Sequence, residues 1–256
     1  MSDMFQDGTA YYDQMVDWQR RLEREAPFYR RVFEQHHVRS VLDCACGTGH
    51  HAAMFAGWGL AVTGSDLSEE MVERARKQHG EHARLRWLVR SFHDLSGIGE
   101  PFDAVICVGN SLALAADGKQ ACRDALASMA AVVRPGSLLI VHVLNIWRVA
   151  PGELVVQKLM PLTPESGEAL LLKLFHRAGS QGYIDTLIVS RPDAGAAWCG
   201  EHHTARPIGL RGAWVRRTLT ELGFARVDLW GDYQCTRYRA DRSVDLIVTA
   251  EKASPS

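Results

Sequence analysis

The hydrophobic and polar positions of residues 40–144 alternate between short apolar runs and longer amphipathic stretches. The apolar runs have the length of buried strands, and they span residues 40–46, 61–66, 85–91, 102–109 and 137–144. Between them the apolar positions have helical spacing, at residues 50–58, 68–78 and 119–133. Strands and helices that alternate at these lengths predict a doubly wound, mostly parallel α/β sheet.

The flanking segments have different patterns. Residues 9–37 have helical spacing, and Pro27 suits the first turn of a second helix better than the middle of one long helix. Residues 153–210 contain β-like runs separated by Gly, Pro and Ser, which predicts antiparallel strands laid over the sheet. After one more helix, the apolar runs 225–232 and 243–252 are joined by a short connection. We therefore expect these last two strands to pair antiparallel.

Composition excludes several classes of protein. The chain has 256 residues, a formal net charge of −1 and a pI near 6.8, so nothing predicts binding to nucleic acid or to anionic lipid. The first residues lack the basic and apolar regions of a signal peptide, and no apolar stretch has the length of a membrane span. The six cysteines are scattered, which is typical of reduced thiols in a cytoplasmic protein.

The sequence does not predict a metal site. Cys44 and Cys46 are too close together for a zinc knuckle, and no second Cys or His pair follows at the required spacing. The paired histidines lie at positions 36–37, 50–51 and 202–203, and adjacent side chains point in different directions on a helix or a strand.

Polar and glycine residues follow the predicted strands at their carboxyl ends, where open α/β sheets bind ligands. Gly47 and Gly49 let the backbone pass close to a ligand, with the start of a helix just beyond. Asp66 ends the second strand, where a carboxylate can accept both hydroxyls of a ribose. A single glycine turn of this kind also fits a plain strand–turn–helix without a ligand. Several predicted strand ends carry such residues, however, and together they favour a ligand site. These residues are Asp43, Gly47–Gly49, Asp66, Ser91–Phe92 and Val108–Ser111.

The residues around the glycine turn indicate which nucleotide fits. A dinucleotide site needs G-x-G-x-x-G, whereas the run from Cys46 to His51 has no third glycine and carries bulky imidazoles. This disfavours a nicotinamide-dependent dehydrogenase. Asp43 would repel a pyrophosphate but suits a ligand that carries an ammonium group. S-Adenosylmethionine meets this requirement.

Three segments carry a family resemblance. "VLDCACGTG", "GSDLSEEMVERAR" and "FDAVICVGNSL" resemble the class I S-adenosylmethionine-dependent methyltransferases, and "CVGNSLAL" is similar to the glycine N-methyltransferase-like branch. The resemblance implies a Rossmann-like, seven-stranded sheet with its last strand antiparallel. It also implies four divisions, namely an N-terminal helical lid (1–38), a cofactor-binding core (39–150), an antiparallel β substrate cap (151–211) and the C-terminal part of the core (212–256).

The resemblance also implies the cofactor-binding residues. Asp43 and the Ala45–Gly49 backbone should hold the methionine portion, Asp66 the ribose and Leu67 the adenine. Arg21 should pair with the methionine carboxylate, with Arg20 as the neighbouring alternative, although Arg21 also suits a surface pair with Glu25 at i+4. Ser91 stands where the family has Asp or Asn, and Asp94 is a candidate to compensate. The full predicted set is Tyr11, Trp18, Arg21, Asp43, Ala45, Gly47, Gly49, Asp66, Leu67, Ser91, Phe92, Val108, Asn110 and Ser111.

The acceptor site departs from the branch. Leu144 stands where the branch has a glycine-binding arginine, and Ala205 or Arg206 where it has a tyrosine, so the acceptor should be larger and more apolar than glycine. The candidate acceptor-binding residues are Tyr12, Leu144, Asn145, Trp147, Trp198 and Arg206. No catalytic residue is assigned, and the candidates are Asn110, His142, His202 and His203. The last two histidines also suit ordinary surface positions of a strand.

The sequence therefore predicts a cytoplasmic methyltransferase that acts on a small molecule, most readily at nitrogen. Two alternatives stay open. One is O-methylation of a small hydroxylated metabolite, and the other is a protein that binds S-adenosylmethionine without catalysis. No Asp/Asn-Pro-Pro-Tyr/Phe motif follows the fourth strand, which disfavours methylation of DNA or protein. Homo-oligomers are compatible with this prediction.

Overall fold

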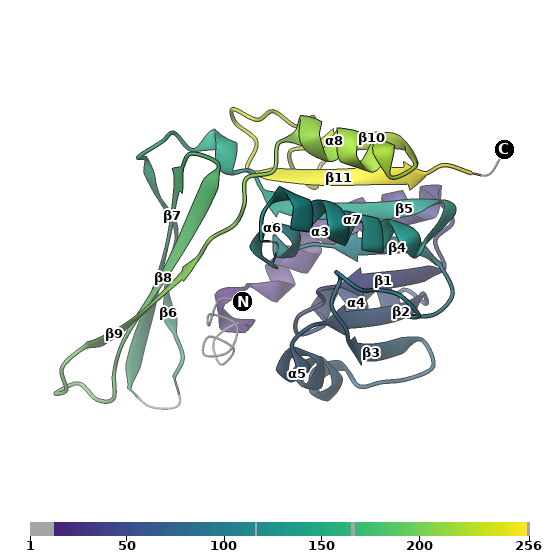
Figure 1. Ribbon diagram of the computed structural model, residues 1–256. Helices are drawn as coiled ribbons and strands as arrows, with labels where there is room; N and C mark the ends of the chain where they lie inside the picture. The colour runs from purple at the N-terminus through teal and green to yellow at the C-terminus, as the bar shows by residue number, and fades with distance from the viewer. Residues whose placement is uncertain (1–12, 116, 165–166, 255–256) are drawn as a thin grey trace.

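The computed structural model describes residues 13–115, 117–164 and 167–254, which form two separate sheets (Figure 1). The strands of the seven-stranded sheet are β1 (Ser40–Cys44), β2 (Ala61–Asp66), β3 (Leu85–Val89), β4 (Phe102–Cys107), β5 (Val133–Leu144), β10 (Phe224–Trp230) and β11 (Asp245–Lys252). The four-stranded sheet, here called the cap sheet, consists of β6 (Leu154–Leu162), β7 (Glu168–Ala178), β8 (Gln181–Arg191) and β9 (Cys199–Ala205).

The larger sheet is mostly parallel, as the sequence predicts. Its strand order is β10-β11-β5-β4-β1-β2-β3, and β11 runs antiparallel to both β5 and β10. The order reverses beside β1, so the carboxyl ends of β1, β2 and β4 meet at one edge of the sheet. The prediction that the last two strands pair antiparallel is confirmed. Strand β5 begins before the predicted residue 137, because the preceding helix already ends at Ala131.

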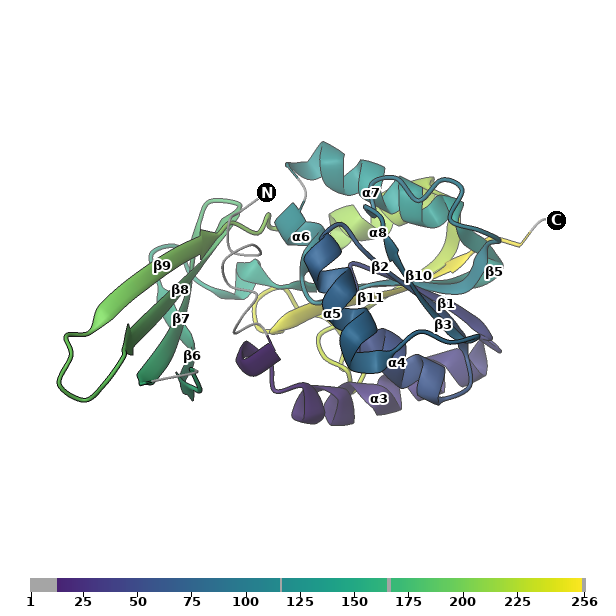
Figure 2. The same ribbon diagram turned by 90° about the horizontal axis from the view of Figure 1, so that it is seen from below.

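Helices cover both faces of this sheet (Figure 2). On one face lie α3 (Trp18–Gln35), α4 (His50–Gly57) and α5 (Glu69–His79), and on the other α6 (Ser111–Ala115), α7 (Lys119–Ala131) and α8 (Gly212–Glu221). The hydroxyl of Ser68 accepts the Met71 N–H at 3.3 Å and caps α5, as expected from the sequence. Two apolar clusters result, one on each side of the sheet.

The prediction that Pro27 starts a second helix is wrong. Pro27 lies inside the continuous helix α3, although an interior proline loses a backbone hydrogen bond and costs about 3 kcal/mol. The helix buries Phe28, Tyr29 and Phe33 just beyond the proline, packed against the sheet and α4. Tertiary packing of this apolar face therefore outweighs the local preference to break.

The cap sheet leaves the core at the carboxyl end of β5, through the short helix η1 (Ile146–Arg148), and its strands pair antiparallel in chain order. One face of the cap sheet, here called the inner face, carries Phe175, Ile184 and Ala205, which pack with residues of η1, β5 and α6. Further along, the same face packs against Met15. Met15 belongs to residues 13–17, which precede α3 and are here called the N-terminal segment. The opposite, outer face includes the exposed Leu154 and Leu159.

The predicted antiparallel sheet after β5 is thus confirmed, while the division of the chain after residues 38, 150 and 211 stays a prediction. Among the described residues, none of the helices combines the length and the apolar character that crossing a membrane requires.

Candidate active site

The turn after β1 has an unusual backbone. Ala45, Gly47 and Gly49 have φ values of 84°, 55° and 84°, in the left-handed region that side chains disfavour. The N–H groups of Ala45 and Cys46 both donate to the Ser65 carbonyl of β2, at 2.7 and 2.9 Å. These two bonds hold the alanine in its strained conformation, and such strain is concentrated at functional sites.

Gly49 has a packing reason as well as a conformational one. A Cβ at Gly49 would overlap the Trp87 ring, and a Cβ at Gly64 would lie 2.5 Å from the same ring. Trp87 is buried and donates its indole N–H to the Gly80 carbonyl at 2.7 Å. Gly49 is therefore needed to seat this tryptophan against the turn, which the sequence argument about ligand approach did not include.

Asp43 is buried at the end of β1, and neither of its carboxylate oxygens has a hydrogen-bond partner among the described residues. Burial and the nearby charge of Asp66 raise the pKa of Asp43 to about 7, while Arg21 opposes this shift. An unpaired buried carboxylate is costly. It fits a ligand that supplies an ammonium group, as the methionine portion of S-adenosylmethionine does.

Asp66 shapes the neighbouring strand end. Its two oxygens accept the N–H groups of Gly47 and Ser68, each at 2.9 Å, so the carboxylate joins the two turns. Burial raises its pKa above the ordinary value, against these hydrogen bonds. Leu67 follows with 47% of its surface exposed, which leaves an apolar side chain free to contact an adenine. The carboxylate and the exposed leucine fit the predicted adenosine portion of the ligand.

The third strand end is less polar than the family pattern. The Ser91 hydroxyl accepts the His93 N–H at 3.2 Å, and Phe92 is buried behind it. Asp94, the predicted substitute for the usual acidic residue, is exposed and accepts the N–H and hydroxyl of Ser96. Asp94 is therefore already hydrogen-bonded to Ser96. Its role in adenine binding stays a prediction.

Asn110 holds the end of β4 against β5. It has φ 73°, and its Oδ1 accepts the Leu144 N–H at 3.0 Å. Its Nδ2 is buried and has no partner among the described residues. Ser111 begins α6 and donates its hydroxyl to the Val108 carbonyl at 2.9 Å. A donor at Asn110 is therefore available beside the strand ends, whereas Ser111 serves the local turn.

Arg21 forms the expected i+4 pair with Glu25, and its role toward the methionine carboxylate stays a prediction. Its Nε donates to Glu25 at 2.9 Å. One of its guanidinium nitrogens lies 3.7 Å from the point that a Cβ would occupy on Gly109, which follows β4. Glu25 is buried, and burial opposes ionisation, but His51 at 2.8 Å and Arg21 lower its pKa to about 2. Burial lowers the pKa of His51, so the neutral ring donates Nε2–H to Glu25. Glu25 thereby aims the arginine at the strand ends.

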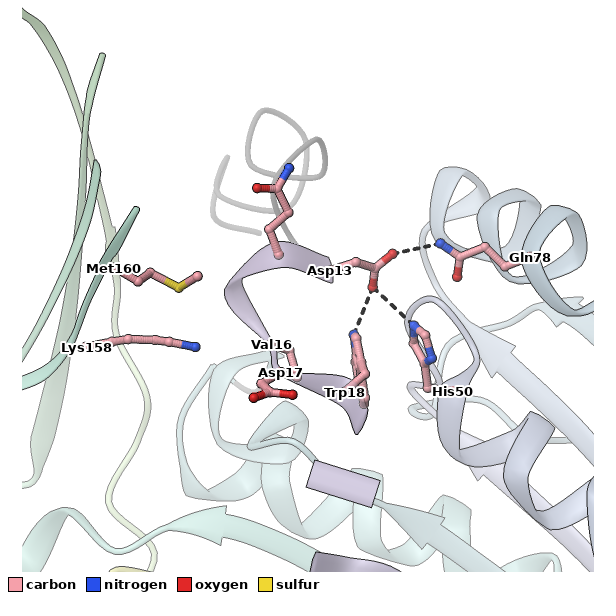
Figure 3. Close-up of a pocket in the computed structure, with 9 residues that line it drawn as sticks. Asp13, Val16, Asp17, Trp18, His50, Gln78, Lys158 and Met160 are labelled. Carbon is pink, nitrogen blue, oxygen red and sulfur yellow. Dashed lines mark hydrogen bonds and ion pairs between the residues drawn. The ribbon is translucent and has the colours of Figure 1, made fainter. Parts of the chain in front are cut away.

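The N-terminal segment is joined to the core through Asp13, which the sequence argument missed (Figure 3). Its carboxylate accepts Thr48 at 2.7 Å, Gln78 at 2.8 Å and the Trp18 indole at 2.9 Å, and lies 3.4 Å from His50. Burial would raise the pKa of Asp13, but these hydrogen bonds hold it below the ordinary value. Tyr11 and Tyr12 lie outside the described residues.

Trp18 stacks on His50, with ring centroids 4.3 Å apart, at the first residue of α4. A cavity of about 640 Å³ opens beside this pair. Its walls are Trp18, His50 and Gln78 on one side, and Lys158 and Met160 of β6 on the other, and Figure 3 shows Lys158 and Met160 extending from the cap sheet toward the N-terminal segment. The cavity therefore lies between the cap sheet and the turn that follows β1.

The side chains of His142 and Asn145, two polar candidates near the end of β5, are hydrogen-bonded within the fold. The His142 Nδ1 accepts the Gly109 N–H at 3.2 Å, and its Nε2 donates to Asp245 at 3.0 Å. Asn145 is buried, and its side chain bonds four groups of the surrounding loops. Both residues thus hold the loops around the end of β5.

Trp147 and Leu144 lie where the cap sheet joins the core. The Trp147 ring lies 3.7 Å from the Arg211 guanidinium, and its indole donates to the Leu210 carbonyl at 3.3 Å. Leu144 packs with Trp147 against the buried cluster that includes Phe175. These two residues are beside the strand ends, as predicted, and their acceptor contacts stay predictions.

The remaining acceptor candidates separate in space. His202 bonds Asp185 at 3.1 Å on the outer face, whereas the next residue, His203, is on the inner face opposite Thr186. The guanidinium of Arg206 lies 5.9 Å from the ring of Tyr183, also on the outer face. His202 and Arg206 therefore lie on the face opposite His203, because successive side chains of a strand point to opposite faces. Their contact with the acceptor stays a prediction.

Trp198 is also remote from the strand ends. It lies in the connection between β8 and β9, at the end of the cap sheet farthest from the larger sheet (Figure 1), with Arg191 over its ring at 4.8 Å. Its contact with the acceptor stays a prediction. Within the described part of the chain, no group of three or more His, Cys, Asp or Glu side chains could hold a metal ion.

Lys158 and Lys173 lie on the inner face of the cap sheet as cross-strand neighbours, and neither was predicted as a site residue from the sequence. Lys173 had a signal, because it is the one charge within the apolar run Ala169–Phe175 of β7. Lys158 had none, since a bulge between Val156 and Lys158 reverses the alternation of β6.

Together, the strand order, the two acidic strand ends and the glycine turn define the class, an S-adenosylmethionine-dependent methyltransferase. Residues 41–136 match the methyltransferase domain family. Solved structures with the same fold include the sugar N-methyltransferase KedS8 from Streptoalloteichus sp ATCC 53650, with a TM-score of 0.74, 20% identity and coverage of 95% of this chain and 91% of that one. CalS10, an amino pentose methyltransferase from Micromonospora echinaspora, gives 0.72 at 19% identity, with 95% of each chain covered.

Curated relatives narrow the class to a branch. The glycine/sarcosine N-methyltransferase of Parasynechococcus marenigrum (strain WH8102) is 31% identical over 246 residues, which cover 90% of this chain and 78% of the relative. The glycine N-methyltransferase of Rattus norvegicus is 34% identical over 145 residues, half of each chain. The chain belongs to the class I S-adenosylmethionine-dependent methyltransferases and resembles their glycine N-methyltransferase-like branch. S-Adenosylmethionine is its methyl donor.

Proposed function

We propose that this methyltransferase acts on the nitrogen of a small-molecule amine other than glycine. The observation that carries the proposal is the engagement of His142, whose two ring nitrogens are both used within the fold beside the strand ends. An amine that arrives neutral needs no general base, whereas a hydroxyl acceptor does. The relatives named as N-methyltransferases support the same choice.

The reaction depends on position more than on proton transfer. S-Adenosylmethionine supplies an electrophilic methyl group on a sulfonium. The amine nitrogen forms a bond to that carbon with its lone pair, the carbon–sulfur bond breaks with its electrons left on sulfur, and the methylated ammonium releases a proton. Well-oriented reactants reach effective molarities of about 10⁵–10⁸ M. The chain contributes the rigid turn after β1, the N-terminal segment fixed by Asp13, and the cap sheet.

Leu144 supports an acceptor other than glycine. It occupies the end of β5, where the branch has its carboxylate-binding arginine, and it packs with Trp147 against Phe175. An isobutyl side chain cannot pair with a carboxylate. The acceptor should therefore contact an apolar surface at this point and be larger than glycine.

A panel of paired acceptors tests this proposal. Each pair shares one carbon skeleton and ends in either an amine or a hydroxyl group, and glycine and sarcosine are included. The purified protein is incubated with S-adenosylmethionine, and methylated products are identified by mass spectrometry. We expect methylation of an amine member and none of glycine. Methylation confined to the hydroxyl members would overturn the proposal.

One observation favours O-methylation as the second candidate. The Nε2 of His203 is buried on the inner face and has no hydrogen-bond partner among the described residues, so a base is present on the cap sheet. If this histidine is a base, His203→Gln should abolish the acidic limb of the pH–rate profile. For an amine acceptor the limb should stay, because it then reports protonation of the acceptor.

A further inference from the structure

A row of polar side chains crosses the inner face of the cap sheet between two apolar groups. Lys158 of β6 lies opposite Lys173 of β7, which lies opposite Thr186 of β8, which lies opposite His203 of β9. Phe175 and Ile184 flank the row on one side, and Leu171 and Ile188 on the other. Four polar residues therefore form a continuous line across four strands.

Among the described residues, no carboxylate balances the positive charge of the two lysines in this row. Lys158 donates its ammonium to the Met15 carbonyl at 2.8 Å, and neither lysine forms an ion pair among the described residues. Lys173 has no hydrogen bond there either, and burial together with the charge of Lys158 lowers its pKa. Like charges directly opposite each other on paired strands are destabilising. A bound anion would remove this cost.

The nearby carboxylates of the described residues do not form ion pairs with the two lysines. Asp17 accepts the Arg20 N–H at 3.1 Å as the cap of α3, and Asp13 belongs to the cluster with Thr48 and Trp18. Glu201 is largely exposed and lies 3.9 Å from His203 rather than beside the lysines. Among the described residues, no carboxylate therefore pairs with either ammonium group, which favours a bound anion as their partner.

The row is placed to act on the methyl acceptor. Lys158 and Met160 form one wall of the 640 Å³ cavity, and His50, directly after the glycine turn, forms part of the opposite wall (Figure 3). The turn is the predicted binding site of the cofactor. A molecule that spans the cavity would thus have one end at Lys158, the cross-strand neighbour of Lys173, and the other toward the strand ends.

We propose that Lys158 and Lys173 bind an anionic group of the acceptor, and that Thr186 and His203 extend this subsite across the cap sheet. This inference rests on the proposed function and narrows its substrate class to amines that carry a carboxylate or a phosphate ester, well separated from the nitrogen. Carboxylate binding by lysines on the cap sheet differs from binding by an arginine after β5, where this chain has Leu144.

Anion binding by itself provides the first test and does not depend on methylation. Thermal unfolding is measured with inorganic phosphate and with acetate for the wild type, Lys173→Met, and the control Lys119→Met, which removes an exposed lysine at the start of α7. We expect both anions to raise the unfolding temperature of the wild type and the control, and to lose this effect in Lys173→Met. Lys173→Gln serves as the second variant if the first fails to fold. An equal shift of the unfolding temperature by the anions in the wild type, the control and Lys173→Met would overturn the proposed subsite.

Kinetics then identify the anion. Acceptors are compared in pairs, the amino acid against its amide, and the phosphate ester against its alcohol. We expect Lys173→Met to lower kcat/KM for the charged member by at least tenfold through KM, to leave the neutral member unchanged, and to leave binding of S-adenosylhomocysteine unchanged in calorimetry. The pair that responds shows which anion is used. An equal loss for charged and neutral members would overturn the proposal. Anion binding without any amine methylation would retain the subsite and overturn only the proposed function.

Discussion

The carboxyl edge of the seven-stranded sheet and the inner face of the cap sheet each hold an ionisable side chain without a hydrogen-bond partner among the described residues, but the charges of the two groups have opposite sign. At the sheet edge this group is Asp43, and on the cap sheet it is Lys173. The donor carries an ammonium and a sulfonium, so an anionic wall suits it. A cationic wall on the other side suits an acceptor with the opposite charge.

The two regions also build their sites differently. At the sheet edge, backbone geometry contributes directly, through the left-handed residues Ala45 and Gly47 and the N–H groups that Asp66 accepts. On the cap sheet only side chains contribute, from an ordinary antiparallel ladder. A substitution on the cap sheet can therefore change the ligand without disturbing the fold, whereas one at the sheet edge alters both.

The largest effect is expected from removal of Asp66. Asp66→Ala should weaken binding of S-adenosylhomocysteine by roughly 1–3 kcal/mol, because charged hydrogen bonds to the ligand are lost together with the acceptor for two backbone N–H groups. Titration calorimetry measures the affinity. Asp124→Ala, at an exposed position on α7, is the matched control and should bind normally. Unchanged affinity in Asp66→Ala would remove this carboxylate from the site.

Arg21 and Arg20 form a natural pair for the next comparison. Arg21 reaches toward Gly109 from a bond to buried Glu25, whereas Arg20 is exposed. Arg21→Ala should weaken binding of S-adenosylhomocysteine about tenfold through one lost charged hydrogen bond, and Arg20→Ala should leave it unchanged. Calorimetry of both variants decides. The reverse result would assign the carboxylate of the cofactor to Arg20.

Asp43 predicts a pH dependence whose sign follows from its raised pKa. The folded protein keeps a proton on Asp43 from pH 3.8, its ordinary pKa, up to about pH 7, while the unfolded chain has released it. Stability of the ligand-free protein should therefore fall as the pH rises through this interval, and Asp43→Asn should flatten the decline. Thermal unfolding at a series of pH values measures it.

Binding should show the opposite trend, because a cationic ligand favours the ionised form of Asp43. The affinity of the wild type for S-adenosylhomocysteine should rise several-fold from about pH 5.5 to about pH 6.5, because Asp43 increasingly ionises there while an α-amino group, with its ordinary pKa of about 7.7–8.0, stays protonated. Asp43→Asn should bind weakly and without this rise. An identical pH dependence in wild type and variant would contradict the assignment of Asp43 to the ammonium.

The sheet edge could be predicted from the sequence because its signals are local. Asp43, Gly47 and Asp66 lie within one strand–turn–helix–strand unit, so their meeting at one edge follows from the parallel pairing of β1 and β2. The same logic failed for Pro27, where packing of distant residues keeps the helix continuous. It also missed Asp13, whose partners Thr48 and Gln78 are far away in the chain.

The cap sheet could be predicted as a sheet but not as a site. Its face assignment depends on register, and the bulge beside Val156 places Lys158 on the inner face although Val156, two residues earlier, is on the outer face. Simple alternation would have put both on one side. For the same reason His202 and His203 could not be assigned to faces before β8 and β9 were paired.

The smallest effect, and the sharpest test of the two faces, is expected from His202. It is exposed on the outer face and forms hydrogen bonds with Asp185 and Thr204 there. His202→Gln should therefore change kcat/KM for the best acceptor less than about twofold. It should also leave the unfolding temperature nearly unchanged, as surface substitutions do. His203→Gln, one residue away on the inner face, should raise KM for a charged acceptor by a larger factor. Steady-state kinetics of the two variants compare the faces directly. A greater loss in His202→Gln than in His203→Gln would mean that the acceptor binds the outer face, which would displace the lysine subsite as well.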